Sequence, residues 1–130
     1  MAKILIVDDD AMTVDMLSMA LKLFGHDVLR AYKGEEALAQ VASNKPDAVL
    51  LDLMMPGLDG FEILKRLKAL PEARTVPVLV VTASAEVDVE ERVTMAGGAG
   101  CLHKPIDLDV LEREIQRVLA VVSALTVNAP

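Results

Sequence analysis

Three carboxylates and one lysine of this 130-residue chain stand where chemistry is expected. Asp8 and Asp9 follow one apolar run, Asp52 closes another, and Lys104 precedes a proline. Carboxylates held about 4 Å apart repel each other by up to about 4 kcal/mol per pair at an effective dielectric constant of 20. They therefore need a cation, or their pKa values shift. Carboxylate oxygens without a histidine or thiolate beside them favour Mg2+, or Mn2+ in its place.

A hydrated Mg2+ at such a cluster would attract a phosphoryl group. Asp52 is then a candidate nucleophile, because a carboxylate can form a covalent phosphoryl intermediate. The metal and Lys104 would neutralise charge on the phosphoryl oxygens, and the hydroxyl of Thr82 would donate a hydrogen bond to them. The residue types thus predict a phosphoryl-accepting site, if the fold brings them together.

The apolar pattern predicts the strands that position these residues. Three runs are apolar without alternation, which is typical of strands buried on both faces. These runs cover residues 3–7, 48–51 and 77–81. Asp8, Asp52 and Thr82 follow them directly. Shorter strands are expected at 27–31 and 100–103, and the second leads into Lys104.

Apolar residues at helical spacing predict one helix after each strand. The expected helices cover residues 13–24, 35–42, 61–70, 86–96 and 108–125. Asp59 and Asp107 are expected to cap the third and fifth helices, and Gly25 is expected to end the first in the left-handed conformation. Five alternating strands and helices predict an α/β fold, a parallel sheet with helices on both faces. The carboxyl ends of its strands would gather the candidate residues at one edge.

The composition excludes several classes of function. The single cysteine, Cys101, cannot form an internal disulfide. The chain shows no signal peptide, and no apolar run approaches the ~18 to 20 residues of a membrane span, so we expect a cytoplasmic protein without membrane contact. The formal net charge of -7 argues against direct binding to nucleic acid and favours cations or basic partner surfaces.

Four motifs together resemble the receiver domain of bacterial two-component response regulators. They are Ile6-Val7-Asp8-Asp9-Asp10, Leu51-Asp52-Leu53-Met54-Met55-Pro56-Gly57-Leu58-Asp59-Gly60, Val80-Val81-Thr82-Ala83 and Lys104-Pro105. Each motif is weak alone, but their order and spacing are specific. The resemblance implies a CheY-like, flavodoxin-like fold with a doubly wound, five-stranded sheet in the order 2-1-3-4-5. It assigns residues 1–122 to the receiver domain and leaves 123–130 as an extension of the last helix or the start of a linker.

The resemblance implies a role in metal binding or phosphoryl transfer for several residues. Asp52 would accept a phosphoryl group from the phosphohistidine of a sensor histidine kinase or phosphotransfer protein. Asp9, Asp52 and the main-chain carbonyl of Met54 would bind Mg2+ directly. Asp8 would act largely through metal-bound water.

The phosphoryl oxygens would meet a second set of groups. The resemblance implies that Thr82 turns its hydroxyl toward them, that the main-chain N–H of Ala83 donates, and that Lys104 pairs with them. It also implies a cis peptide bond between Lys104 and Pro105.

One position departs from the family. Members usually carry Tyr or Phe where this chain has Cys101, and that ring moves inward with the threonine. The smaller thiol cannot make the same rotamer change. The sequence therefore does not determine how a change at Thr82 would reach the outer surface through this switch position. We expect Cys101 to be a small hydrophobe on a half-buried strand, and we expect both histidines, His26 and His103, at the surface.

Two other classes of protein compete with this interpretation. A small hydrolase of the haloacid dehalogenase type would use Asp8-Asp9-Asp10 but would leave Asp52 and Lys104 unexplained. A receiver-like binding module would dock partners without phosphorylation, yet such modules lack one of the acidic or lysine positions. The favoured interpretation is a phosphorylation switch that catalyses only its own phosphorylation and dephosphorylation.

The output of such a switch is not fixed by the sequence. Its expected partners are a separate output protein or a C-terminal effector domain, with a homodimer formed on phosphorylation as a further option. By similarity to the family, the last two helices and the strand with Cys101 form the candidate contact surface.

Overall fold

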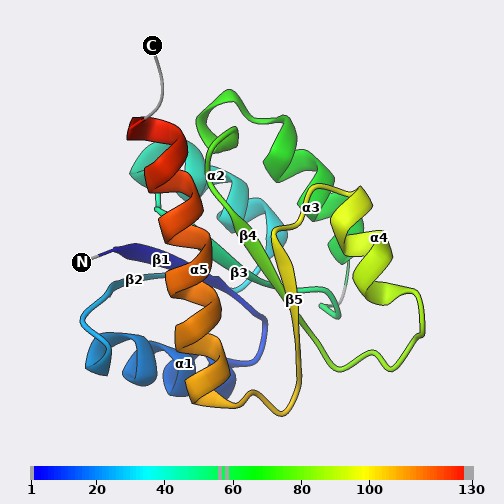
Figure 1. The fold of residues 1–130 in the computed structure, drawn as a ribbon. Coiled ribbons are helices and arrows are strands. Elements are labelled where there is room, and N and C mark those ends of the chain that lie inside the picture. The colour runs from blue at the N-terminus through cyan, green and yellow to red at the C-terminus, as the bar shows by residue number, and fades with distance from the viewer. Residues whose placement is uncertain (1, 56, 58, 128–130) are drawn as a thin grey trace.

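The computed structural model describes residues 2–55, 57 and 59–127, with the side chains of 123–127 left aside. Its centre is a sheet of five parallel strands (Figure 1). The strands are β1 (Lys3–Val7), β2 (Asp27–Ala31), β3 (Ala48–Asp52), β4 (Val78–Thr82) and β5 (Gly100–His103). Their order is β2-β1-β3-β4-β5, which confirms the predicted fold class and strand order.

Helices cover both faces of this sheet. They are α1 (Ala11–Leu23), α2 (Gly34–Asn44), α3 (Gly60–Ala69), α4 (Val89–Met95) and α5 (Leu108–Val127), with a short 3-10 helix η1 (Pro71–Ala73) after α3. The helices α1 and α5 pack on one face, and α2, α3 and α4 pack on the other. Of the segment 123–130, residues 123–127 belong to α5, which ends at Val127, and residues 128–130 lie outside the described part of the chain. None of the described helices is long and apolar enough to cross a membrane.

Alternation along the central strands explains why both faces are apolar. In β1, Leu5 and Val7 join the core under α2, α3 and α4, whereas Ile4 and Ile6 join the core under α1 and α5. Successive side chains of a strand point to opposite faces, so a strand between two helical layers must be apolar throughout. The interpretation of the apolar runs as buried strands is therefore confirmed.

The helix ends follow the predicted capping residues. The side chain of Asp59 accepts a hydrogen bond from the N–H of Phe61 at 3.0 Å. Asp107 accepts from Asp109 and Val110 at 2.9 and 3.2 Å. Gly25 has a φ of +90°, as expected for the residue that ends α1. Local sequence was sufficient to predict these helix ends, because each capping residue lies within a few residues of the helix that it begins or ends.

α4 is shorter than predicted. The expected helix begins at residue 86, but α4 begins at Val89. The hydroxyl of Ser84 accepts a hydrogen bond from the N–H of Glu86 at 3.2 Å. The main-chain carbonyl of Glu86 accepts one from the N–H of Val89 at 3.4 Å. A serine side chain that binds nearby backbone favours a turn over a helix, so the first residues of the predicted helix form a loop.

His26 contradicts its predicted place at the surface, whereas His103 is exposed as expected. The side chain of His26 is buried, and its Nε2 lies 3.6 Å from Oε2 of Glu112 on α5. The residue follows the turn at Gly25. α5 packs over this turn from far along the chain, and no local pattern predicts that contact.

Gly60, the first residue of α3, has no room for a side chain. A Cβ at this position would lie 2.5 Å from the Cα and carbonyl oxygen of Leu53, the residue after Asp52. Gly60→Ala must displace that backbone, and overpacking of this kind costs about 1 to 3 kcal/mol. We therefore expect a clear fall in the urea midpoint of unfolding.

Gly34→Ala is the matched control, because Gly34 begins α2 in the same way. Its Cβ would meet only the side chain of Ile63, at 2.6 Å, and that side chain can rotate. We expect a smaller fall in the midpoint for this variant. Equal midpoints for the two variants would show that the backbone at Leu53 tolerates the displacement.

Candidate functional site

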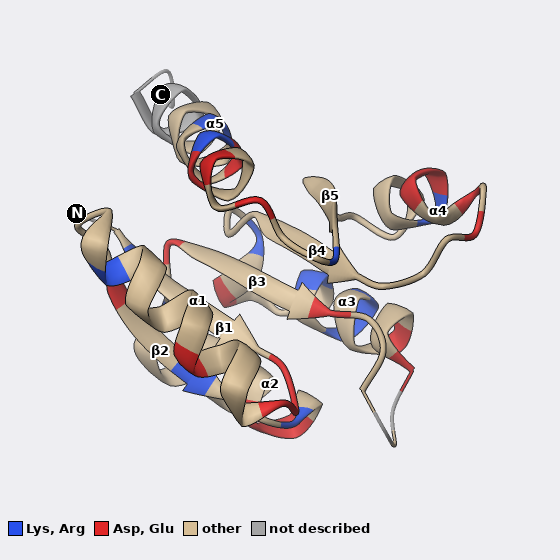
Figure 2. Ribbon diagram, turned by 90° about the horizontal axis from the view of Figure 1, so that it is seen from below, with Lys and Arg blue, Asp and Glu red and all other residues tan. Residues whose placement is uncertain are grey.

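The carboxylates of Asp8, Asp9 and Asp52 meet at the carboxyl edge of the sheet. One ligand oxygen from each lies within 4.8 Å of the others. Asp8 and Asp9 follow β1, and Asp52 ends the neighbouring strand β3. Figure 2 shows this acidic edge as red segments where β1 and β3 end. The structure thus brings together the three acids that the sequence singled out.

Asp52 is a buried acid whose neighbours shift its pKa in opposite directions, and the residue is only 4% exposed. Burial raises the pKa of its carboxyl above the ordinary value, and the negative charge of Asp8 acts in the same direction. Two contacts oppose this rise. The N–H of Met54 donates to Oδ1 at 3.0 Å, and Nζ of Lys104 lies 3.5 Å from Oδ2.

Lys104 lies between the two buried acids. Its Nζ donates to Oδ2 of Asp8 at 3.1 Å and lies 3.5 Å from Oδ2 of Asp52. Burial alone would lower the pKa of Lys104, but the hydrogen bond to Asp8 and the charge of Asp52 raise it overall. The ammonium group therefore stays charged. The peptide bond from Lys104 to Pro105 is cis, as the resemblance implied.

Thr82 ends β4, the strand beside β3, and is fully buried. Its Oγ1 accepts a hydrogen bond from the N–H of Ser84 at 3.0 Å, and its carbonyl accepts from the N–H of Lys104 at 2.8 Å. Within the described chain, the N–H of Ala83 has no hydrogen-bond partner and is free to donate to a ligand. The hydrogen bond from the N–H of Lys104 to the carbonyl of Thr82 joins these two residues directly through the backbone.

The donors at this edge fit Mg2+. Three carboxylates supply hard oxygen ligands, and the backbone of Met54 lies beside Asp52 because its N–H is bound there. The carbonyl of Met54 accepts no hydrogen bond from any described residue, so it is available as a further oxygen donor. Oxygen ligands of this kind suit Mg2+ better than zinc. Pro56 and Leu58 of the same motif lie outside the described residues.

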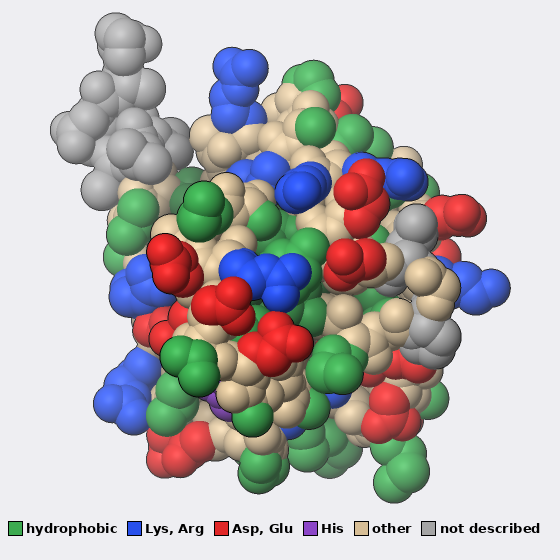
Figure 3. Space-filling view, turned by 90° about the vertical axis from the view of Figure 1, so that its right-hand side faces the viewer, with side chains coloured by type: hydrophobic (Ala, Val, Ile, Leu, Met, Phe, Trp, Pro, Cys, Tyr) green, Lys and Arg blue, Asp and Glu red, His purple; other side chains and the backbone are tan. Residues whose placement is uncertain are grey.

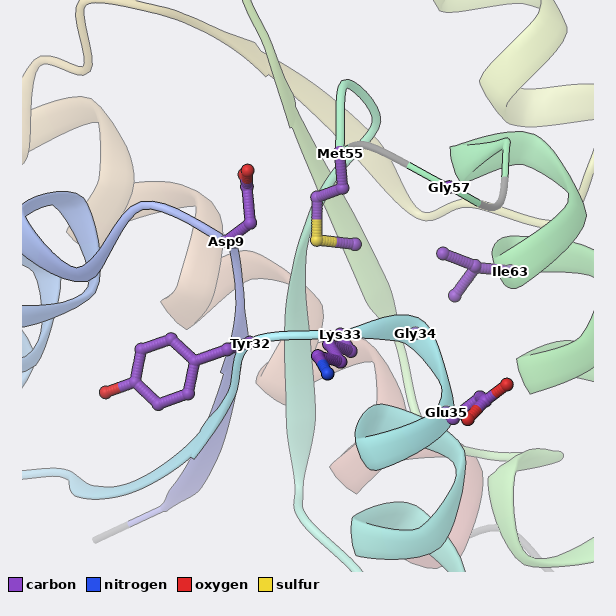
Figure 4. Close-up of a pocket in the computed structure, with 8 residues that line it drawn as sticks. All are labelled: Asp9, Tyr32, Lys33, Gly34, Glu35, Met55, Gly57 and Ile63. Atoms are coloured by element: carbon purple, nitrogen blue, oxygen red, sulfur yellow. The ribbon is translucent and has the colours of Figure 1, made fainter.

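A hollow of about 600 Å³ opens beside Asp9. Its walls are the loop after β2, the loop after β3 and the first turn of α3, and its lining residues are Asp9, Tyr32, Lys33, Gly34, Glu35, Met55, Gly57 and Ile63. In Figure 4 the side chains of Met55 and Ile63 approach it from two sides. Sequence reasoning missed this hollow, although residues 32–35 follow β2 and so belong to the same edge of the sheet.

The chain is similar in sequence to proteins of one known family. A family model described as the response regulator receiver domain matches residues 4–116. The chain is 38% identical over 120 residues to Protein PilH of Pseudomonas aeruginosa, across 92% of this chain and 99% of PilH. It is 39% identical over 117 residues to the transcriptional regulatory protein ZraR of Salmonella typhimurium, across 90% of this chain and 26% of ZraR.

Solved structures show the same fold. The chemotaxis protein CheY4 of Vibrio cholerae superposes with a TM-score of 0.85 at 32% identity, across 91% of this chain and 98% of that one. The signal receiver domain of a DNA-binding response regulator from Colwellia psychrerythraea superposes with a TM-score of 0.84 at 33% identity, across 92% and 99%. These matches confirm the resemblance that the motifs indicated.

The raised pKa of Asp52 predicts how stability depends on pH without metal. The folded chain holds the proton of the Asp52 carboxyl more tightly than the unfolded chain does. The stability gained from this proton is fully present below the ordinary pKa of 3.8 and is lost as pH rises through the raised value. At neutral pH the ionised Asp52 opposes folding. We expect Asp52→Asn to raise the free energy of unfolding at pH 7 without Mg2+, because the amide removes the buried negative charge.

Urea unfolding across pH would check this prediction, with Asp27→Asn as the control because Asp27 is exposed and lies at the start of β2. The gain of Asp52→Asn should shrink toward pH ~4. Mg2+ should stabilise the native chain more than the variant, because a ligand of the folded state adds stability in proportion to its binding. A variant that is less stable than the native chain at pH 7 without metal would contradict the prediction.

Proposed function

The chain belongs to the response regulator receiver family, and we propose that it is a phosphorylation-activated switch of a two-component phosphorelay. One observation carries this proposal: the buried carboxylate of Asp52 lies between a cluster of acidic metal ligands and the ammonium group of Lys104. A carboxylate so placed can accept a phosphoryl group whose negative charge is met from two sides. The protein would act in the cytoplasm.

The proposed reaction is attack by a carboxylate oxygen of Asp52 on the phosphorus of a phosphohistidine. The O–P bond forms while the N–P bond breaks, and the electron pair of that bond returns to the imidazole. Bound Mg2+ would supply charge neutralisation for the phosphoryl oxygens. Lys104 would exchange part of its contact with Asp8 and Asp52 for a phosphoryl oxygen. The free N–H of Ala83 and the hydroxyl of Thr82 would donate to the others.

The outer face of α1 supports a helical protein as the donor. Four large apolar side chains of α1 are exposed, at a spacing of four, three and four residues: Met12 81%, Met16 46%, Met19 67% and Leu23 84%. Such a stripe is typical of a helix that packs on another helix. Because it begins directly after Asp8, Asp9 and Asp10, a helix docked on it would bring its histidine to the acidic edge. The partner would be a sensor histidine kinase or a phosphotransfer protein.

The output of the switch is proposed to be a protein contact. PilH is covered almost completely by the chain, whereas ZraR has further parts, so similar domains occur both nearly alone and joined to others. α4 and the loop before it carry the exposed acids Glu86, Asp88, Glu90 and Glu91. Figure 3 shows red side chains gathered among blue and green ones on the face that includes α4. A partner with a basic surface would fit there. No turnover other than self-phosphorylation and its reversal is proposed.

Intact mass spectrometry after incubation with acetyl phosphate and Mg2+ tests the proposal. The native chain should gain one phosphoryl mass, and the gain should need Mg2+. Asp52→Asn should show no gain. Asp27→Asn should behave as the native chain, because Asp27 begins β2 and so lies at the edge of the sheet opposite the site.

Two outcomes would contradict the proposal. If no variant gains mass with any small phosphoryl donor, the chain is better explained as a binding module that works without phosphorylation. Multiple turnover of a phosphate ester that survives Asp52→Asn but is lost in Asp8→Asn would instead indicate a hydrolase.

The side chain of Met54 predicts a long-lived phosphoaspartate. It lies two residues past the acceptor, is 61% exposed and cannot orient an attacking water by hydrogen bonding. Met54→Gln supplies an amide at this place, so we expect the phosphoryl group to be lost severalfold faster after the donor is removed. Met95→Gln on α4 is the control. Loss from the native chain within seconds would count against this role of Met54.

A further inference from the structure

His103 and Glu90 join the end of β5 to α4. Nε2 of His103 lies 2.9 Å from Oε1 of Glu90. Among the described residues, this is the only side-chain hydrogen bond between these two elements. Both side chains are partly exposed, so the contact adds little to stability. Its interest lies in what it connects.

His103 is locked to the residue that would contact the phosphoryl group. In the sheet, His103 is the register partner of Thr82. The next residue, Lys104, donates its N–H to the carbonyl of Thr82 at 2.8 Å. The ends of β4 and β5 are therefore held together at the level of the site. A displacement of the backbone at Thr82 must be shared by His103.

His103 also occupies the side of β5 from which the family's aromatic ring is missing. Residues two apart in a strand point to the same face, so Cys101 and His103 share one face, while Leu102 joins the core under α1 and α5. Cys101 packs against the core under α2, α3 and α4. Its thiol has no hydrogen bond to any described residue. Burial raises the pKa of this thiol, and the negative charge of Glu90 adds to the rise.

α4 depends on few contacts to keep its place. It has seven residues, of which only Val89 and Val93 are buried. On one side Arg92 binds Glu86 at 3.2 Å and lies 4.2 Å from the ring centre of Phe61 on α3. On the other side the polar contact is that of Glu90 with His103. A short helix with little buried surface belongs to the least stable part of a fold and responds to small forces.

We propose that His103 is a positioning residue that carries the movement of Thr82 to α4 through Glu90, the task for which Cys101 is too small. This inference rests on the proposed phosphorylation of Asp52. When the hydroxyl of Thr82 turns toward the phosphoryl group, it gives up its hydrogen bond from Ser84 and the loop 83–88 rearranges. The contact between His103 and Glu90 keeps α4 attached to β5, so α4 moves with the strand. Without that contact, the loop responds and α4 does not.

Amide hydrogen exchange with and without acetyl phosphate and Mg2+ tests this proposal, with the phosphorylated fraction read from intact mass in the same samples. In the native chain, phosphorylation should change exchange in both 83–88 and 89–95. In Glu90→Ala the loop should still respond, but the response of 89–95 should fall by at least half. Glu91→Ala is the matched control, because Glu91 is the next exposed acid of α4 and makes no hydrogen bond or ion pair with the described residues.

Variants at His103 separate transmission from folding. His103→Ala should reproduce the effect of Glu90→Ala, whereas His103→Gln keeps a donor for Glu90 and should restore at least part of the α4 response. In the native chain the imidazole nitrogen resonances of His103 should shift on phosphorylation, and this shift should be smaller in Glu90→Ala. A purely structural contact would give none of these state-dependent differences.

The outcomes distinguish this inference from the proposed function. If mass shows phosphorylation and α4 responds equally in the native chain, Glu90→Ala and His103→Ala, the inference is overturned while the proposed function stands. The same holds if α4 never responds in the phosphorylated native chain. Absence of phosphorylation in the native chain would overturn both.

Discussion

The site depends on the repulsion between the buried carboxylates of Asp8 and Asp52. Two such groups cannot remain ionised side by side without a counter-charge. In the protein alone that counter-charge is Lys104, which contacts both. Lys104 does not offset the whole cost of the buried charge, because burial, together with the charge of Asp8, still raises the pKa of Asp52. In the proposed function, the remaining repulsion would favour binding of a cation, and a cation together with Lys104 would favour binding of a phosphoryl group. The chemistry proposed for the chain is thus a consequence of holding too much negative charge in one place.

Holding the charges together requires a rigid support. Asp52 ends a strand whose five residues are all buried, β4 beside it is equally buried, and β1 on its other side is buried in all but its first residue. Close-packed interiors resist displacement, so the sheet prevents the acids from moving apart. The backbone after Asp52 is fixed further by the tight approach of Gly60 to Leu53. The least buried parts near the site lie at its periphery, where the loop 83–88 is largely exposed and the short α4 buries only Val89 and Val93.

The sequence predicted what depends on local pattern and on the topology of parallel strands. The strands, the caps at Asp59 and Asp107, and the gathering of Asp8, Asp9, Asp52, Thr82 and Lys104 followed from apolar runs and from the rule that strand ends share an edge. Contacts between distant segments could not be derived in this way. The burial of His26 under α5, the hollow beside Asp9 and the pairing of His103 with Glu90 each depend on how helices settle on the sheet. The exposed stripe of α1 was readable in principle, because it repeats at the same period as the buried residues of that helix.

Cys101 lies away from the carboxylates of the site, so the proposed chemistry and the proposed output can vary separately. The proposed acceptor, the proposed metal ligands and Lys104 lie at the ends of β1 and β3 and in the segment after β5, so a smaller residue at position 101 does not disturb them. What changes is the link between Thr82 and the surface. A buried aromatic ring couples two sites by packing, which works only if the space around it can be filled in two ways. A hydrogen bond such as that between His103 and Glu90 would couple the two sites instead because it forms only within a narrow range of distance and angle. Because that contact is exposed and weak, it can be broken or remade by a partner that binds α4, and coupling between the two sites would then run in both directions.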